Sequence, residues 1–243
     1  MPLHFASIRE EHGETSIAGL ASATNTNEAL FLMKKYFAGR VDFRLGSEVE
    51  NYEKRQDDML RRLDKHPNTR GSIDVLLGAE PAGLDGLQGI RKMAEARQIR
   101  GMWISFHPQL ISDDAPEILV ELQKLIGALD FSVVSTTHEF PWTAGATFVL
   151  PMAGWAEETG TYTNFAGRVQ ISNHAVQPPG EAQPLHKMMS ALLGLAGIQV
   201  SPDPAAIFEW IAREVPPYAG MDYDAIGPLG LPGVYTPQQE AVR

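Results

Sequence analysis

The residues of this chain that could carry out chemistry are few, and two carboxylates and one arginine stand out. Glu157 and Glu158 are adjacent and precede a glycine turn, where they could serve as general acid and general base. Arg168, between Gly167 and Val169, could clamp a carboxylate or a phosphate through two parallel hydrogen bonds. Plainer roles compete with these: solvated carboxylates for the glutamates, and a structural salt bridge from Arg168 to Glu157 or Glu158.

The histidines are not spaced as metal ligands, and the serines and threonines are not placed as catalytic nucleophiles. The seven histidines include no His-x-x-x-His pair and no cluster with carboxylates at ligand spacing, so we predict no metal site. His107, His138 and His174 are predicted at strand ends, where they could line a cleft, and His186 is predicted to be partly exposed on a helix. No hydroxyl lies in a Gly-x-Ser-x-Gly elbow, which leaves Ser112, Ser135 and the pair Thr136-Thr137 without a predicted catalytic role.

Composition excludes several classes of protein. The chain has no cysteine, so it can supply neither thiolate ligands for iron–sulfur clusters nor disulfides. Its formal charge of −10 argues against a nucleic-acid surface, and its one basic cluster is interleaved with acids (Arg61, Arg62 and Lys65 among Asp57, Asp58 and Asp64). No apolar stretch approaches the roughly 20 residues that cross a bilayer, and the N-terminus lacks a signal pattern. We expect a soluble cytoplasmic protein without direct membrane insertion.

Short apolar strands alternate with amphipathic helices through the first two thirds of the chain. Strands are predicted at 41–45, 73–78, 101–106, 131–134 and 147–151, and helices at 26–37, 48–65, 86–98 and 116–129, with Asn25 or Thr26 as the cap of the first helix. This alternation predicts a doubly wound α/β fold with a mostly parallel sheet covered on both faces.

The last third of the chain has a different pattern. Residues 157–170 alternate around Gly160 and Gly167, which predicts a β-hairpin inserted after the sheet. Helices are predicted at 185–195 and 204–215, followed by a Gly/Pro-rich segment (227–237) that can bury little and that we expect to wrap over the surface or to be partly disordered. We therefore expect a sheet domain over 1–155, with the hairpin, helices and tail of 156–243 packed on it as one unit.

The hairpin region resembles the molybdopterin oxidoreductase superfamily. The similarity follows the pattern VLPxxxxxExxGTxTNxEGRVQ…PPGEA, with matches at Leu150-Pro151, Glu157, Gly160-Thr161, Thr163-Asn164, Gly167 to Gln170 and Pro178 to Ala182. Earlier matches include Ser22 and Thr26-Asn27-Glu28, and later ones include Phe208, Ile211 and Val215 to Gly220. Within the superfamily the chain is most similar to the later, molybdopterin-domain-like portion of the large G (75-kDa) subunit of NADH–quinone oxidoreductase.

The resemblance implies where a cofactor would lie and also gives reasons to expect none. In molybdenum-bearing relatives the strand-end loops and the hairpin cradle the pterin, so Gly78, Thr161, Asn164, Gly167 and Arg168 are candidate vestigial contacts. Two loops depart from the pattern, because Glu80 replaces Asn and Thr147 replaces Asp. A carboxylate beside a pyrophosphate is repulsive by about 1 kcal/mol in water. We expect no cofactor, no metal and no catalytic residue on this chain.

Three functions remain open at this point. The leading hypothesis is a cluster-free scaffold portion of a G subunit in the soluble arm of a respiratory complex, peripheral to the inner membrane, with the clusters on a Cys-rich iron–sulfur partner. The second is part of a molybdopterin enzyme such as a formate dehydrogenase, contributing half of the pterin cleft. The third is a stand-alone nucleotide binder, although the glycines after the predicted strands form no Gly-x-Gly-x-x-Gly fingerprint.

Overall fold

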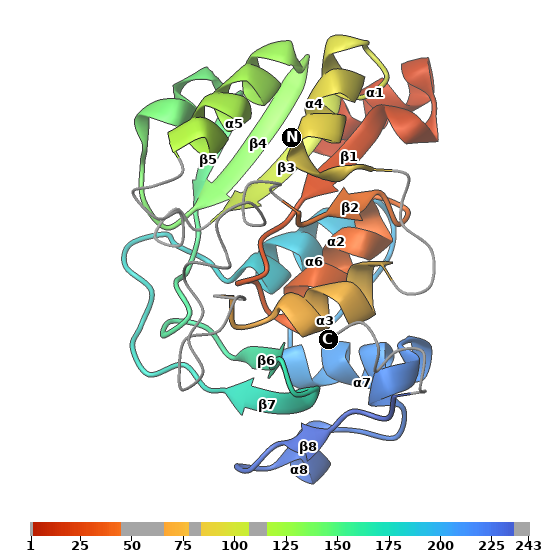
Figure 1. The fold of residues 1–243 in the computed structure, drawn as a ribbon, viewed down its shortest axis with the longest axis vertical. Helices are drawn as coiled ribbons and strands as arrows, with labels where there is room; N and C mark the ends of the chain where they lie inside the picture. Colours follow the sequence, from red (N-terminus) through yellow and green to blue (C-terminus); the bar gives the residue numbers. More distant parts are fainter. Residues whose placement is uncertain (1, 45–65, 78–83, 107–115, 236–243) are drawn as a thin grey trace, which may run out of the picture.

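A five-stranded parallel sheet forms the centre of the protein. A computed structural model describes residues 2–44, 66–77, 84–106 and 116–235, and its main sheet has the order β2-β1-β3-β4-β5 (Figure 1). The strands are β1 (Ile17–Leu20), β2 (Val41–Asp42), β3 (Gly101–Phe106), β4 (Phe131–Thr136) and β5 (Phe148–Pro151). Each neighbouring pair is parallel.

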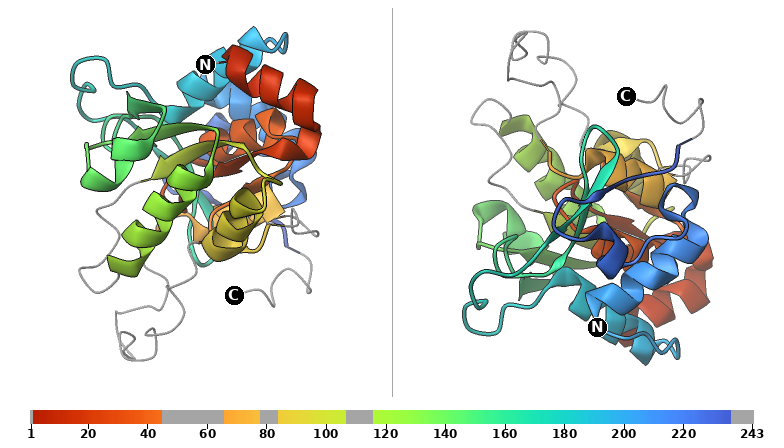
Figure 2. Two further views of the ribbon diagram at one scale, coloured as in Figure 1. Left: turned by 90° about the horizontal axis from the view of Figure 1, so that it is seen from above. Right: turned by 90° about the horizontal axis from the view of Figure 1, so that it is seen from below.

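Helices cover both faces of this sheet, which confirms the predicted doubly wound α/β class. One core includes Ile17, Trp103 and Val133 and packs against α1 (Pro2–His12), α2 (Asn27–Tyr36) and α6 (Leu185–Leu195). The other includes Met102 and Val134 and packs against α4 (Gly86–Glu95) and α5 (Pro116–Ala128). Figure 2 shows the sheet between these layers. Strands buried on both faces are mostly apolar, as in 101–106, and the three hydroxyl residues of 131–136 are buried as well.

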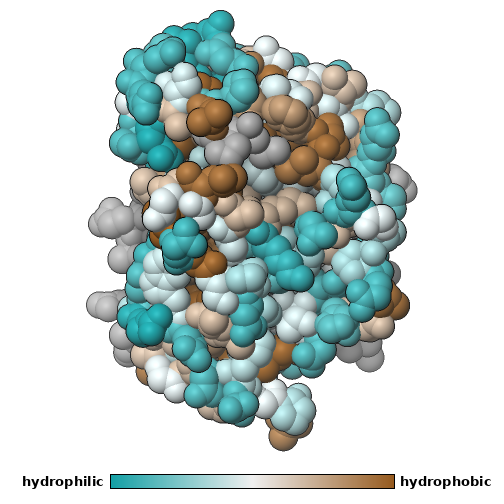
Figure 3. Space-filling model, turned by 180° about the vertical axis from the view of Figure 1, so that it is seen from behind, coloured by the Kyte–Doolittle hydropathy of each residue, from teal (hydrophilic) through white to brown (hydrophobic). Residues whose placement is uncertain are grey.

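The outer edge of the sheet is less covered than its centre. Phe148 and Val149 of β5 are 40% and 41% exposed, because β5 is paired with β4 alone among the described strands. The rear face of the molecule carries other apolar side chains as well, gathered mainly in its upper half among polar ones (Figure 3).

A second, antiparallel sheet contains the predicted hairpin. It is formed by β6 (Gly160–Thr163), β7 (Arg168–Ser172) and β8 (Leu231–Pro232). Gly167 closes the turn at φ +74°, a conformation that side chains other than glycine rarely adopt. Strand β8 comes from the Gly/Pro-rich segment, so this part of the tail is ordered against the hairpin (Figure 2). The helices α7 (Pro204–Glu214) and α8 (Tyr223–Ile226) connect α6 to β8.

Two predictions about the first half of the chain were incomplete or wrong. Residues 73–78 were predicted as a strand, but the described part of this segment is helical, with α3 (Thr69–Ser72) continuing into the π-helical turn η3 (Ile73–Leu77). A short apolar run has the same signature in a strand and in a buried helix, and here Val75 and Leu76 are buried in the core with α2. Conversely, Ile17 to Leu20 forms a central strand that was not predicted from the sequence.

The other predicted strands and helices that lie among the described residues agree with the structure within a few residues, whereas α1 and α8 were not predicted. Helix α2 begins after Thr26, whose hydroxyl accepts a hydrogen bond from the amide of Ala29 at 3.3 Å. The short helical turns η1 (Glu14–Ser16), η5 (Pro141–Gly145) and η6 (Pro216–Tyr218) complete the described elements. The predicted helix at 48–65 lies outside the described residues, and the division at residue 155 stays a prediction. Among the described helices, none combines the length and apolar character needed to cross a membrane.

Candidate functional site

The strand order of the main sheet reverses between β1 and β3. In open α/β sheets ligands bind where the strand order reverses, and in this sheet that point lies between β1 and β3. The loop after β1 is buried and internally bonded: the side chain of Asn25 accepts from the amide of Ser22 at 2.9 Å, and the carbonyl of Ala23 accepts from the amide of Asn68 at 3.0 Å. This loop was not predicted to lie at a strand end because β1 was not predicted as a strand.

Of the three strand-end loops predicted to carry ligand contacts, one is described. The loop beginning at Gly78 follows a helical turn, which corrects its predicted place at a strand end, and Gly78 and Glu80 lie outside the described residues. His107 and Ser112, after β3, also lie outside them. After β4, Ser135 accepts a hydrogen bond from the indole of Trp103 at 3.0 Å, and the hydroxyl of Thr136 donates to the carbonyl of His138 at 3.0 Å.

A buried carboxylate from α2 holds the hairpin against the main sheet. Glu28 is fully buried and accepts three hydrogen bonds, from the amide of Thr161 at 2.8 Å, from its hydroxyl at 2.9 Å and from the hydroxyl of Tyr223 at 2.9 Å. Burial raises the pKa of Glu28, and these hydrogen bonds oppose the rise. The family motif around Thr26 to Glu28 and the Gly160-Thr161 motif are therefore two halves of one contact.

Two asparagine side chains extend this contact along the hairpin. The amide of Asn27 donates to the hydroxyls of Thr161 and Thr163 at 3.0 and 3.2 Å. Asn68 donates to the side-chain oxygen of Asn27 at 3.0 Å and accepts from the backbone amide of Thr163 at 2.7 Å. Gly71 passes so close that a methyl group there would overlap the side-chain oxygens of Asn27 and Asn68. We call Asn27, Glu28, Asn68, Thr161 and Thr163 the hairpin anchor.

The four described cofactor candidates use their polar groups within the protein. Thr161 belongs to the hairpin anchor, and the side-chain oxygen of Asn164 accepts from the amides of Ala166 and Arg168 at 2.9 and 3.0 Å, closing the turn with Gly167. The guanidinium of Arg168 donates to the carbonyls of Leu229 and Gly230 at 3.3 and 2.8 Å. These carbonyls take the place of the predicted salt bridge to Glu157 or Glu158, because β8 lies beside β7.

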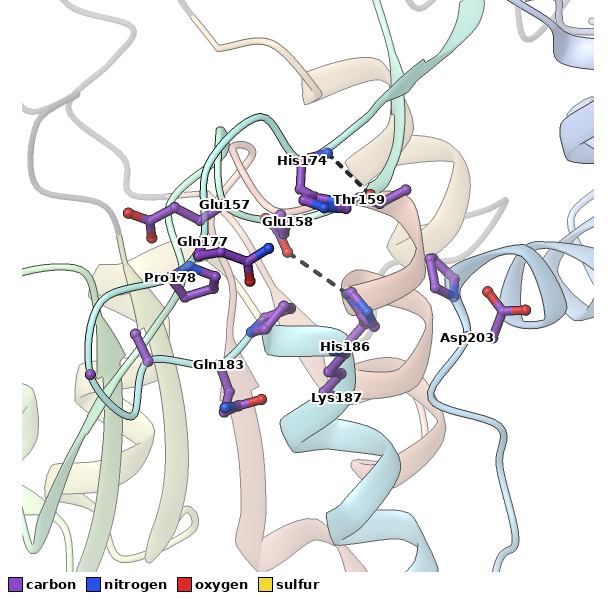
Figure 4. Close-up of a pocket in the computed structure, with 14 residues that line it drawn as sticks. Glu157, Glu158, Thr159, His174, Gln177, Pro178, Gln183, His186, Lys187 and Asp203 are labelled. Atoms are coloured by element: carbon purple, nitrogen blue, oxygen red, sulfur yellow. Dashed lines mark hydrogen bonds and ion pairs between the residues drawn. The ribbon is translucent and has the colours of Figure 1, made fainter.

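A polar cavity of about 570 Å³ lies between the β5–β6 connection and the first turns of α6 and α7 (Figure 4). Glu158 and His186 face each other across it, with 3.8 Å between the carboxylate Oε2 and the imidazole Nδ1. That separation is too long for a hydrogen bond. His174 also lines the cavity, as predicted, and its Nδ1 lies 3.2 Å from the hydroxyl of Thr159.

The burial of this pair corrects two predictions. Glu157 and Glu158 were predicted to be solvated, and His186 to be partly exposed. The side chains of Glu158 and His186 are instead 5% and 2% exposed, because both lie where the hairpin connection meets the first turn of α6. Glu157 is half-buried, and one of its carboxylate oxygens accepts from the amide of Gly154 at 2.7 Å. Adjacent positions in the sequence thus have different surroundings.

Burial also sets the electrostatics of the cavity. It raises the pKa of Glu158, and the neighbouring imidazole of His186 opposes that rise. The pKa of Tyr162 is raised well above its usual range by burial and by the carboxylates of Glu158 and Glu28. Within the described ranges, no three histidine or acidic side chains are grouped closely enough to hold a metal ion.

Comparison with known proteins points to one family. Residues 83–195 match the family model described as Molybdopterin oxidoreductase. Over 114 residues the chain is 37% identical to F420-dependent formate dehydrogenase 2 subunit alpha of Methanococcus maripaludis, which covers 45% of this chain and 17% of that protein. Over 144 residues it is 32% identical to F420-dependent formate dehydrogenase subunit alpha of Methanocaldococcus jannaschii, covering 58% of this chain and 20% of that protein.

These matches support the molybdopterin oxidoreductase family for the matched part of the chain. They do not single out the G subunit of NADH–quinone oxidoreductase, because the relatives named above are formate dehydrogenase subunits. The matched segment spans a fifth or less of each relative. Among solved structures, acetylene hydratase from Pelobacter acetylenicus aligns with 61% of this chain and 20% of its own, at 18% identity and a TM-score of 0.38.

Proposed function

We propose that this chain is part of a molybdopterin oxidoreductase of the formate dehydrogenase kind, in which it forms one wall of the cofactor cleft. The observation that carries the proposal is the family match over residues 83–195, which include β3, β4, β5, the hairpin and α6. These elements surround the carboxyl ends of the sheet strands, the side on which α/β folds bind ligands. Formate is the proposed substrate because the similar proteins are formate dehydrogenases.

The described side chains do not by themselves fit a pterin ligand set. Thr161, Asn164 and Arg168 each make hydrogen bonds to partners within the protein, so these three candidate contacts are already engaged. We therefore propose that the isolated chain binds no complete cofactor and that other parts of the enzyme supply the remaining contacts. Because these 243 residues include no cysteine, any iron–sulfur cluster of the enzyme must be held outside them, and we propose a Cys-rich iron–sulfur protein for that role.

The scaffold role in a respiratory complex has less support. It would keep the same architecture and the same Cys-rich partner, and it would place the chain at the inner membrane through that complex. The similarity to formate dehydrogenase subunits favours the molybdenum enzyme instead.

The proposal is tested by isolating the assembly that contains this chain. The tagged chain is expressed with its neighbouring genes and purified, and the assembly is analysed for molybdenum, for pterin fluorescence after oxidation and for formate-dependent reduction of a viologen dye. We expect all three signals in the assembly and none in the chain purified alone. A stable assembly with quinone-reductase subunits, without molybdenum and without formate activity, would contradict the proposal.

A further inference from the structure

We infer that the cavity between Glu158 and His186 binds a small organic ammonium ion. Nothing in the proposed function requires this ligand. Glu158 comes from the β5–β6 connection and His186 is the second residue of α6, so the two groups reach the cavity from opposite walls (Figure 4).

Two buried polar side chains at the cavity lack hydrogen-bond partners. The Oε2 atom of Glu158 and both ring nitrogens of His186 have no hydrogen-bond partner among the described residues, although both side chains are more than nine-tenths buried. A buried polar group without a partner costs about 1–3 kcal/mol, so such groups are normally satisfied by protein, water or ligand. Both side chains line one cavity, so a bound ammonium can donate to the carboxylate of Glu158 and to the ring nitrogen of His186 that accepts, while the ring N–H needs a water molecule as its acceptor.

The charged side chains that line the cavity favour a cation as the ligand. Three carboxylates line the cavity, from Glu157, Glu158 and Asp203, against one lysine, Lys187. A bound ammonium can donate one hydrogen bond to the carboxylate of Glu158 and another to an accepting ring nitrogen of His186. A cation also favours the ionised form of Glu158, which burial alone disfavours.

The carboxylates beside the two helix ends disfavour an anion as the ligand. Helix N-termini attract anions, and both α6 and α7 begin at this cavity. The first turn of α7 is capped by Asp203, whose carboxylate accepts from the amide of Ala205 at 3.2 Å. The first turn of α6 has no side-chain cap, but the carboxylate of Glu158 lies 3.8 Å from the imidazole of His186 in that turn and repels a second negative charge.

The walls limit the size and the chemistry of the ligand. A cavity of about 570 Å³ accommodates a short alkyl chain with its hydration water. Pro178, Pro184 and Pro204 provide apolar surface for methylene groups, and Gln177 and Gln183 provide further amide oxygens. A primary alkylammonium ion of a few carbons combines these features.

The test compares three probes of equal size with the full chain. Propylammonium, propionate and 1-propanol are titrated at neutral pH, and binding is followed by calorimetry and by the imidazole NMR resonances of His186, assigned with His186→Gln. We expect saturable binding of propylammonium alone. Glu158→Gln should weaken it at least tenfold, whereas Glu157→Gln should change it less than twofold, because one oxygen of Glu157 is already bonded to the amide of Gly154.

A surface variant keeps the test decisive if Glu158→Gln does not fold. Lys187 is exposed, so Lys187→Gln should leave the fold intact, and it should strengthen propylammonium binding about twofold or more by removing a like charge. Three results would overturn the inference: no saturable binding of propylammonium, stronger binding of propionate, or Lys187→Gln binding no more tightly than wild type. A cavity that holds only water would give the first of these.

Discussion

Glu28 shows how a single buried carboxylate can determine the position of a whole hairpin. Its two oxygens accept one amide and two hydroxyl hydrogen bonds, two of them from Thr161 and one from Tyr223. A buried carboxylate is costly unless its lone pairs are satisfied, so the arrangement is stable only when the hairpin and α8 are both in place. The sequence analysis identified Thr26 to Glu28 as a capped helix start but could not identify the partner, which lies 133 residues away.

Glu28 should also give the protein a measurable pH dependence. Burial raises its pKa above the ordinary value of 4.5, so the folded state binds the proton more tightly than the unfolded chain does. The contribution of Glu28 to the free energy of unfolding is therefore largest below pH 4.5 and is lost as the pH rises through the folded pKa. Glu28→Gln removes this titration while keeping the shape.

The measurement is urea unfolding of wild type and Glu28→Gln between pH 4.5 and 8. We expect the stability of wild type relative to the variant to fall as the pH rises above 4.5 and to level off once the pH has passed the folded pKa. Glu158 titrates in both proteins and cancels from the difference. A difference that stays constant with pH would show that the pKa of Glu28 is not raised in the folded state.

At the scale of elements, secondary structure was predicted best where the sequence pattern fitted only one type of element. The strands at 101–106 and 131–136, helix α5 and the hairpin were found because strong periodicity or turn glycines specify them. Residues 73–77 were misassigned because five residues are too few to separate a strand from a buried turn of helix. The cavity was missed because nothing local distinguishes Glu158 from Glu157 or marks His186 as buried. Only the tertiary fold brings positions 158 and 186 together.

The contact between α3 and the hairpin anchor predicts opposite effects for the same substitution at two glycines. Gly71→Ala would place a methyl group against the side-chain oxygens of Asn27 and Asn68, and it should destabilise the protein by about 2 kcal/mol or more. Gly127, in α5, is exposed with open space around it, so Gly127→Ala should stabilise by about 0.5–1 kcal/mol. Thermal and urea unfolding of both variants would measure the two effects. Equal losses would contradict the anchor geometry.

At the scale of the whole molecule, the tail is joined to the first half of the chain through Asp74. Its carboxylate oxygen Oδ2 accepts from the hydroxyls of Tyr235 at 2.9 Å and Tyr218 at 3.3 Å, while Oδ1 accepts from Arg70 at 3.1 Å. The guanidinium of Arg70 also lies 3.9 Å from the centre of the Tyr235 ring. Composition alone led us to expect little burial from the Gly/Pro-rich segment. The segment is held by the pairing of β8 with β7, by Arg168 and by the hydroxyl of Tyr235.

Removing one hydroxyl tests this link. Tyr235→Phe loses the hydrogen bond to Asp74 and should lower the free energy of unfolding by about 1 kcal/mol. The matched control is Tyr162→Phe, because the hydroxyl of Tyr162 is buried without a hydrogen-bond partner among the described residues, and its removal should be neutral or slightly stabilising. Hydrogen exchange at β7 and β8 should rise only in Tyr235→Phe. Similar behaviour of the two variants would contradict a role for the tail in stability.

The hairpin anchor has a consequence for how the protein is made. Glu28 and Tyr223 are 195 positions apart, so a ribosome adding about 5–20 residues per second needs roughly 10–40 s to supply the second after the first. During that interval β1 can already pair with β2 and β3, but Glu28 lacks its hydrogen bond from Tyr223. The contact between α2 and α8 should therefore form last, after the main sheet.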